Sequence, residues 1–229
     1  MTQSKTGILF FSRNPFQESR HKQVHADREK NFKALHLMYD GVKKAIAASE
    51  IPSIELGQEL QSGNSFAERM CKGLKLLFAE GYDHLIVIGN DCPHLEAEDL
   101  LLAKEQLHSG KSVIGYEKDG GAYLFALSKE DFDEEAFLQL PWQCENLGLA
   151  LCDWLSLSKE VIELEEKEDI DNVEDLLFLI LSLRISHILL LLRKLFHTSL
   201  NKGKEIPIHY SRLPGPEQAL RAPPLLASL

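Results

Sequence analysis

The segment HLIVIG, residues 84–89, constrains the fold more than any other part of this 229-residue chain. Its apolar residues follow one another without the polar alternation of a strand that has one face in water. A continuous, largely β-branched run of this length is typical of a strand that helices cover on both faces. We therefore predict that this segment is the central strand of a helix-covered sheet.

Strand-like and helical patterns alternate along the chain on either side of this segment. Further strands are predicted at residues 7–11, 51–56, 111–116, 122–127 and 160–164. Helices are predicted at residues 24–49, 66–78, 96–108, 130–139 and 145–155. This alternation favours an α/β fold with three layers, α/β/α, around a mostly parallel sheet.

Length and composition predict one folded domain, residues 1–197, followed by an extension at residues 198–229. A chain of this length can bury one sizeable core and does not require a second domain. The extension contains five of the nine prolines and shows little periodicity. We expect it to be extended and peripheral.

The segment LLFLILSLRISHILLLL, residues 176–192, is the most hydrophobic part of the chain. It is at the short limit for a membrane span, and Arg184 and His187 lie in its middle, where charge is costly. We therefore expect a helix that packs against the sheet. The alternatives are a homodimer contact and a contact with a membrane surface.

The net charge of −10 argues against a nucleic-acid-binding surface, which needs clustered lysines and arginines. The apolar stretch near the N-terminus is too short for a signal peptide, so we expect a cytoplasmic protein. The cysteines show neither a CxxC pair nor zinc-like spacing, which predicts reduced thiols packed as small apolar groups. They are Cys71, Cys92, Cys144 and Cys152.

The segment GNDCPHL, residues 89–95, places Asp91 directly after the predicted central strand. Open α/β sheets bind their ligands at the carboxyl ends of the strands. Mg²⁺ and Mn²⁺ prefer carboxylates together with waters and substrate phosphates. Asp91 is therefore a candidate metal ligand. The alternative is that Asp91 and Pro93 only shape a turn.

Two more polar segments follow predicted strands, EDIDNVEDL at 168–176 and EKDGGAY at 117–123. Asp171 could share one metal with Asp91 from a different strand end, because carboxylates of one sheet edge can meet there. Alternatively, Asp171 or Asn172 could cap the following helix. The two glycines of EKDGGAY could let backbone N–H groups approach a ligand, or could form only a turn.

Taken in order, the segments GYDHLIVIGNDCPHL, EKDGGAYLFAL, LPWQCENL and EDIDNVEDL resemble the motifs of a bacterial glycosyltransferase-like family. The motifs are GxDCPxL, DGGYYLIGL, a W-S-T segment and D-x-D-T-P-E-D-L, and the family is the type associated with radical-SAM and selenodomain proteins. QSGNSFAERM also resembles its Q-G-D-L-G-E-R-M segment. The resemblance covers about residues 7–177. The family has the nucleotide-diphospho-sugar transferase (GT-A) fold, which 2-phospholactate guanylyltransferase and the molybdenum-cofactor nucleotidyltransferases share.

The resemblance implies a nucleotide-dependent transferase that uses Mg²⁺ or Mn²⁺ and takes a nucleotide sugar or a nucleoside triphosphate. It implies catalytic roles for Asp91 and Asp119, and metal binding by Asp91 and Asp171. It implies substrate contacts from Arg13, Arg20, Lys22, Arg69, Asn90, Gly120, Gly121 and Trp142.

The loop after the first predicted strand departs from the family pattern. The family has K-x-P-x-P-G-x-V-K-T-R-L at this place, whereas this chain has FSRNPFQESRHKQ, residues 11–23, without the glycine. A loop that binds phosphate through its backbone needs glycine or the geometry of a helix end. Three hypotheses therefore stay open: a glycosyltransferase-like enzyme, a nucleotidyltransferase acting on a nucleoside triphosphate, and a binding protein without catalytic activity.

Overall fold

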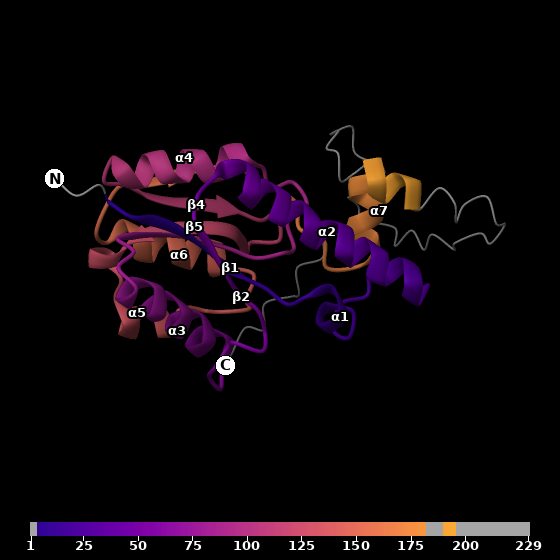
Figure 1. The fold of residues 1–229 in the computed structure, drawn as a ribbon, viewed down its shortest axis with the longest axis horizontal. Coiled ribbons are helices and arrows are strands. Elements are labelled where there is room, and N and C mark those ends of the chain that lie inside the picture. Colours follow the sequence, from indigo (N-terminus) through magenta and orange to yellow (C-terminus); the bar gives the residue numbers. More distant parts are fainter. Residues whose placement is uncertain (1–3, 182–189, 196–229) are drawn as a thin grey trace, which may run out of the picture.

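The computed structural model describes residues 4–181 and 190–195. Within these ranges a six-stranded sheet has the order β2-β1-β3-β5-β4-β6 (Figure 1). β5 runs antiparallel to β3 and β4, and the other neighbouring strands are parallel. The predicted mostly parallel sheet is therefore confirmed. The strands span Thr6–Phe11 (β1), Ser53–Leu56 (β2), His84–Ile88 (β3), Ser112–Tyr116 (β4), Ala122–Ser128 (β5) and Val161–Glu163 (β6).

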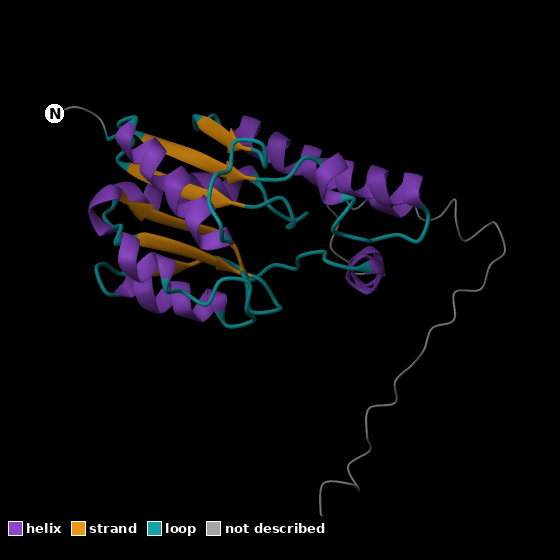
Figure 2. Ribbon diagram, turned by 90° about the horizontal axis from the view of Figure 1, so that it is seen from below, coloured by secondary structure: helices purple, strands orange, loops and turns teal. Residues whose placement is uncertain are grey.

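Helices cover both faces of the sheet, which confirms the predicted three layers (Figures 1 and 2). Val42 of α2 and Leu100 of α4 belong to the core on one face. Leu74 of α3 and Leu151 of α6 belong to the core on the other face. The helices span Pro15–Glu18 (α1), Arg28–Ser49 (α2), Phe66–Ala79 (α3), Ala97–His108 (α4), Glu134–Leu138 (α5), Leu147–Ser156 (α6) and Val173–Leu181 (α7), with a 3₁₀ turn at Lys129–Asp131 (η1).

β3 is the central strand that the sequence predicts. Successive side chains of a strand point to opposite faces of the sheet. Ile86 and Ile88 accordingly lie in one core, and Leu85 and Val87 lie in the other. All four are almost completely buried, so both faces of this strand are covered by helices.

Side-chain caps make three helix boundaries differ from the sequence-based prediction. Asn14 caps α1, a single turn of helix that the sequence pattern did not predict. Asp27 caps α2, which therefore begins later than the predicted residue 24. Asp133 caps α5 and so divides the helix predicted at 130–139 into η1 and α5. Each cap satisfies backbone N–H groups that would otherwise lack a partner.

The apolar segment near the end packs against α2 in its described part. Leu176 and Leu192 are buried together with Leu35 and Met38 of α2. α2 extends beyond the end of the sheet, and α7 lies beside that projecting part (Figures 1 and 2). Among the described residues, no strand contributes to this cluster, which corrects the expected packing against the sheet for this part of the segment.

Part of the predicted helix and the whole predicted extension lie outside the described residues. These are residues 182–189, which include Arg184 and His187, and residues 198–229. In the portion of the chain that is described, no helix combines the length and the apolar character needed to cross a bilayer.

All four cysteines are free thiols, as predicted. Cys71 and Cys92 are buried and Cys152 is half-buried. Cys144 is exposed, so the prediction of a packed thiol is wrong at this position. It lies in the turn before α6.

Candidate functional site

A cavity of about 460 Å³ opens at the edge of the sheet where the sequence predicts a ligand site. The parallel strands β1, β3, β4 and β6 end at this edge, and the antiparallel strand β5 begins there. The charged residues that line the cavity are Arg13, Glu18, Arg69, Asp91, Glu117, Asp119, Glu145 and Asp171. Because carboxylates outnumber guanidinium groups among them, the cavity has a negative potential that disfavours a free phosphate ligand.

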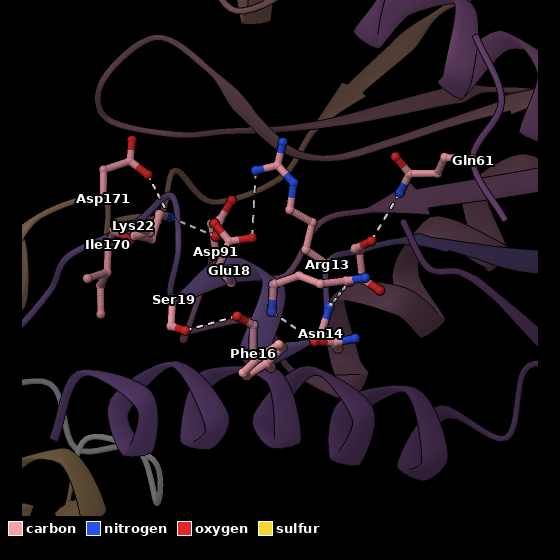
Figure 3. Close-up of polar contacts among 12 residues, drawn as sticks. Arg13, Asn14, Phe16, Glu18, Ser19, Lys22, Gln61, Asp91, Ile170 and Asp171 are labelled. Carbon is pink, nitrogen blue, oxygen red and sulfur yellow. Dashed lines mark hydrogen bonds and ion pairs between the residues drawn. The ribbon is translucent and has the colours of Figure 1, made fainter. Parts of the chain in front are cut away.

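Asp91 and Asp171 come together at this edge, and the ammonium of Lys22 lies between them (Figure 3). Lys22 Nζ lies 2.7 Å from Oδ1 of Asp91 and 2.6 Å from Oδ1 of Asp171, and it donates to the carbonyl of Ile170 at 2.7 Å. The lysine side chain is only 9% exposed. A cation of the chain itself therefore occupies the position at which the sequence predicts a metal. Metal binding by these two carboxylates stays a prediction.

The loop that carries Lys22 is held in place by Asn31 of α2. The side-chain carbonyl of Asn31 accepts hydrogen bonds from the backbone N–H groups of Val24 at 2.7 Å and His25 at 3.1 Å. Its amide donates to the backbone carbonyl of Lys22 at 3.1 Å. Asn31 is buried, so these bonds are made away from water and fix the loop strongly.

Asn172, and not Asp171, supplies the hydrogen bonds at the start of α7. Its side-chain carbonyl accepts from the backbone N–H groups of Glu174 at 2.7 Å and Asp175 at 3.1 Å. Of the two capping candidates in the sequence, this selects the asparagine. The Asp171 carboxylate therefore remains available to Lys22.

The carboxylates around Lys22 keep it charged. Burial alone would lower the pKa of the ammonium, but Asp91 and Asp171 outweigh that effect and raise it. Glu18 of α1 is buried nearby, and Nη1 of Arg13 lies 3.8 Å from its carboxylate (Figure 3). Burial, followed by the charge of Asp91, raises the pKa of Glu18. The Asp91 side of the cavity therefore contains its own compensating cations.

A second acidic group consists of Glu117, Asp119 and Asp169, and one carboxylate oxygen from each lies within 4.8 Å of the others. Burial, followed by the charge of Asp169, raises the pKa of Glu117 to about 9. Burial, followed by the charge of Asp119, raises the pKa of Asp169 to about 7. A divalent cation would relieve this repulsion, and three carboxylates are hard oxygen ligands of the kind that Mg²⁺ and Mn²⁺ prefer. Among the residues described, this is the group spaced closely enough to hold a metal ion.

The turn that carries Glu117 and Asp119 depends on its two glycines. Gly120 has a φ of +94°, and a Cβ atom there would lie 1.7 Å from the backbone oxygen of Glu145. The N–H of Gly120 donates to the carbonyl of Glu117 at 3.0 Å, and the N–H of Gly121 donates to Oδ1 of Asp119 at 2.9 Å. Both glycine N–H groups thus have partners within the turn. This favours the turn over the alternative in which they bind a substrate.

We expect Gly120→Ala to destabilise the protein by about 2–3 kcal/mol, because the new Cβ would clash with backbone in a conformation that L-residues rarely adopt. Gly81→Ala is the matched control, since Gly81 has a similar φ of +83° but no atom lies within 4 Å of its Cβ position. Its expected cost is about 1 kcal/mol. Urea denaturation of both variants measures the difference, and equal losses would show that the contact with Glu145 contributes nothing.

The predicted basic substrate contacts separate into two places. Arg13 and Arg69 line the main cavity. Within the described ranges, no ion pair or side-chain hydrogen bond engages the guanidinium of Arg69. Arg20 instead lies over the ring of Phe16, 4.5 Å from its centroid, and lines a separate cavity of about 590 Å³. Arg20 therefore lies apart from Arg13 and Arg69, and its predicted substrate contact stays a prediction.

Trp142 and Asn90 both line the main cavity, and their predicted substrate contacts stay predictions. The indole N–H of Trp142 donates to the backbone carbonyl of Phe137 at 2.9 Å, and its ring packs against Phe66 and Phe137. The tryptophan is therefore part of the core and presents only part of its surface to the cavity. Asn90 is buried at the end of β3.

The sequence-based site omitted Glu117, Asp169 and Glu18. Two of these have a detectable signal, because Glu117 directly follows a strand and Asp169 is separated by one residue from Asp171. Ile170 between the two aspartates is completely buried, so in extended backbone both carboxylates point away from the core. Glu18 had no such signal, since its short helix was not predicted.

The comparisons with known proteins place this geometry in a fold and in a family. A putative nucleotide-diphospho-sugar transferase from Desulfovibrio desulfuricans G20 is similar over 86% of this chain and 98% of its own, with 23% identity and a TM-score of 0.72. The 4-diphosphocytidyl-2C-methyl-D-erythritol synthase from Anaerococcus prevotii covers 76% of this chain and 96% of its own, with 11% identity and a TM-score of 0.47. The first likeness confirms the predicted nucleotide-diphospho-sugar transferase fold. No curated protein matches the sequence.

A family model matches residues 24–143, which is more than half of the chain and includes Asp91, Asp119 and Trp142. The chain therefore belongs to the family described as "Uncharacterized protein conserved in bacteria (DUF2064)".

Proposed function

We propose that this protein is a divalent-metal-dependent transferase that uses a nucleotide-activated donor, and that the donor is a nucleotide sugar. The observation that carries the proposal is the convergence of the Glu117, Asp119 and Asp169 carboxylates. Glu117 and Asp119 of this group line the cavity at the carboxyl ends of the strands. In sheets of this kind nucleotides bind at that edge. The shared fold with a putative nucleotide-diphospho-sugar transferase supports the same reading.

The charge of the cavity supports a requirement for a metal. A diphosphate would meet an excess of carboxylates, and the arginines of the lining, Arg13 and Arg69, are too few to compensate for them. A Mg²⁺ or Mn²⁺ ion held by Glu117, Asp119 and Asp169 would neutralise the diphosphate leaving group. Arg69, which has no carboxylate partner among the described residues, is proposed to bind phosphate oxygens.

Two further roles follow for residues of the chain. Asp91 lines the cavity, and Lys22 holds its Oδ1 atom. We propose that the Asp91 carboxylate binds the acceptor hydroxyl. The protein then works mainly by positioning the donor and acceptor in a site of fixed charge. Asp119 is proposed as a ligand that would hold the metal beside the donor phosphates.

Melting temperatures measured with nucleotides, with and without Mn²⁺, test this function. A nucleoside diphosphate or nucleotide sugar is expected to raise the melting temperature only when Mn²⁺ is present, by an amount that grows with ligand concentration. Stabilisation by nucleoside triphosphates alone, with release of pyrophosphate, would favour a nucleotidyltransferase. If no nucleotide stabilises the protein under either condition, the transferase proposal fails in favour of a binding protein.

A further inference from the structure

Three oxygen atoms surround the ammonium of Lys22 in the manner of a cation site. Oδ1 of Asp91, Oδ1 of Asp171 and the carbonyl oxygen of Ile170 lie 2.7, 2.6 and 2.7 Å from Nζ (Figure 3). Two carboxylates and a carbonyl are hard oxygen ligands, the kind that bind Mg²⁺ and Mn²⁺. We propose that Lys22 is the resident cation of the Asp91–Asp171 pair, and that its ammonium excludes a second divalent metal from the site.

Charge and position explain why the ammonium excludes a metal. One ammonium does not neutralise the charge of both carboxylates. A divalent ion placed between them would nevertheless be repelled at close range by the positive charge of the ammonium. The ammonium cannot easily move aside, because Lys22 is only 9% exposed and the buried amide of Asn31 holds its backbone. In the described part of the chain, the carboxylates of Asp91 and Asp171 form ion pairs with Lys22 and with no other residue. Removal of the ammonium would therefore leave two facing carboxylates without a cation.

The two acidic groups then have different tasks, an assignment that rests on the proposed function. Glu117, Asp119 and Asp169 hold the one metal of the site. Lys22 keeps the other pair free of metal and fixes the direction of the Asp91 carboxylate at the cavity wall. Lys22 is thus a positioning residue that sets the number of metal ions.

The number of Mn²⁺ ions bound per full-length chain tests the proposal, measured from the electron paramagnetic resonance signal of free Mn²⁺ during a titration. The wild type is expected to bind one ion and Lys22→Met two, a twofold rise, because the vacated oxygens then hold a metal. Lys22→Met combined with Asp171→Asn is expected to bind one ion again. Asp171→Asn alone should keep the single wild-type site, and its side chain is 57% exposed, so the fold should tolerate the change.

Lys167→Met is the matched control for the loss of a buried lysine. Lys167 is also buried, but its ammonium contacts the single carboxylate of Asp99 and the carbonyl of His94 at 2.9 Å. One carboxylate is a poor divalent site, so this variant should still bind one ion. Circular dichroism verifies that each variant is folded.

Two results would overturn the proposal. One is a folded Lys22→Met variant that still binds a single ion. The other, which remains decisive if Lys22→Met does not fold, is loss of the wild-type site in Asp171→Asn, because Asp171 would then be a ligand of the native metal. A wild type that binds no ion and a Lys22→Met variant that binds one would support the role of Lys22 while refuting the proposed metal site at Glu117, Asp119 and Asp169.

Discussion

Asp119→Asn is expected to weaken Mn²⁺-dependent nucleotide binding by about 1,000-fold, or about 4 kcal/mol. Loss of a residue that only supports a metal ligand typically costs 10- to 100-fold, and loss of a direct ligand should cost more. The acidic cavity strengthens the effect, because a diphosphate without its metal would be repelled by the remaining carboxylates. Isothermal titration calorimetry with a nucleoside diphosphate in the presence of Mn²⁺ gives the dissociation constants of the wild type and of Asp119→Asn.

The substitution is chosen so that the fold is preserved. Asp119 is exposed, and the Oδ1 atom of an asparagine can still accept the hydrogen bond from the N–H of Gly121. Asp153→Asn is the matched control, since it removes the same charge from an exposed position on α6 that does not line the cavity. Equal affinity for the nucleotide in the wild type and in Asp119→Asn would show that the Asp119 carboxylate is not a metal ligand.

Glu117→Gln is expected to abolish much of the pH dependence of stability that we predict for the metal-free protein between about pH 5 and 8. Burial and the neighbouring Asp169 raise the folded-state pKa of Glu117 from 4.5 to about 9. Above pH 4.5 the unfolded chain loses this proton while the folded chain retains it. The free energy of unfolding therefore falls as the pH rises, by up to about 1.4 kcal/mol per pH unit, or about 4 kcal/mol across this range.

Urea denaturation at several pH values in the presence of a chelator measures this effect. Glu117→Gln should gain stability relative to the wild type as the pH rises, because its amide never has to become charged in the cavity. Glu166→Gln, at an exposed position outside the cavity, should follow the wild-type curve. Added Mn²⁺ should stabilise the wild type most at high pH, since metal binding requires the deprotonated carboxylate. Parallel curves of unfolding free energy against pH for the wild type and Glu117→Gln would contradict the assignment of a retained proton to Glu117.

The layers of the fold could be predicted because they follow from local patterns. The apolar run at 84–89 requires cover on both faces, and β3 receives it from the helices of the two outer layers. Side-chain caps were harder to foresee, and Asn14 and Asp133 therefore moved helix boundaries. The packing of Leu176 against α2 depends on how far α2 extends beyond the sheet, which no local pattern encodes.

The place of the site could be predicted more completely than its internal pairing. Asp91 and Asp171 were expected to meet because each follows a strand that ends at the same edge of the sheet. The position of Lys22 between them depends on a loop conformation that Asn31 fixes from another element. The raised pKa of Glu117 likewise depends on burial and on Asp169, a residue distant in the sequence. Tertiary contacts, and not local sequence, thus decide which carboxylates are free to bind a metal.

One divalent metal is proposed to bind at Glu117, Asp119 and Asp169 and to recruit a nucleotide. Anomalous diffraction from crystals grown with Mn²⁺ and a nucleoside diphosphate tests it most directly. We predict one manganese peak bound to carboxylate oxygens of this group, with Lys22 still between Asp91 and Asp171. A manganese peak between Asp91 and Asp171, with Lys22 displaced, would contradict the account, and so would bound nucleotide with no manganese at the three carboxylates.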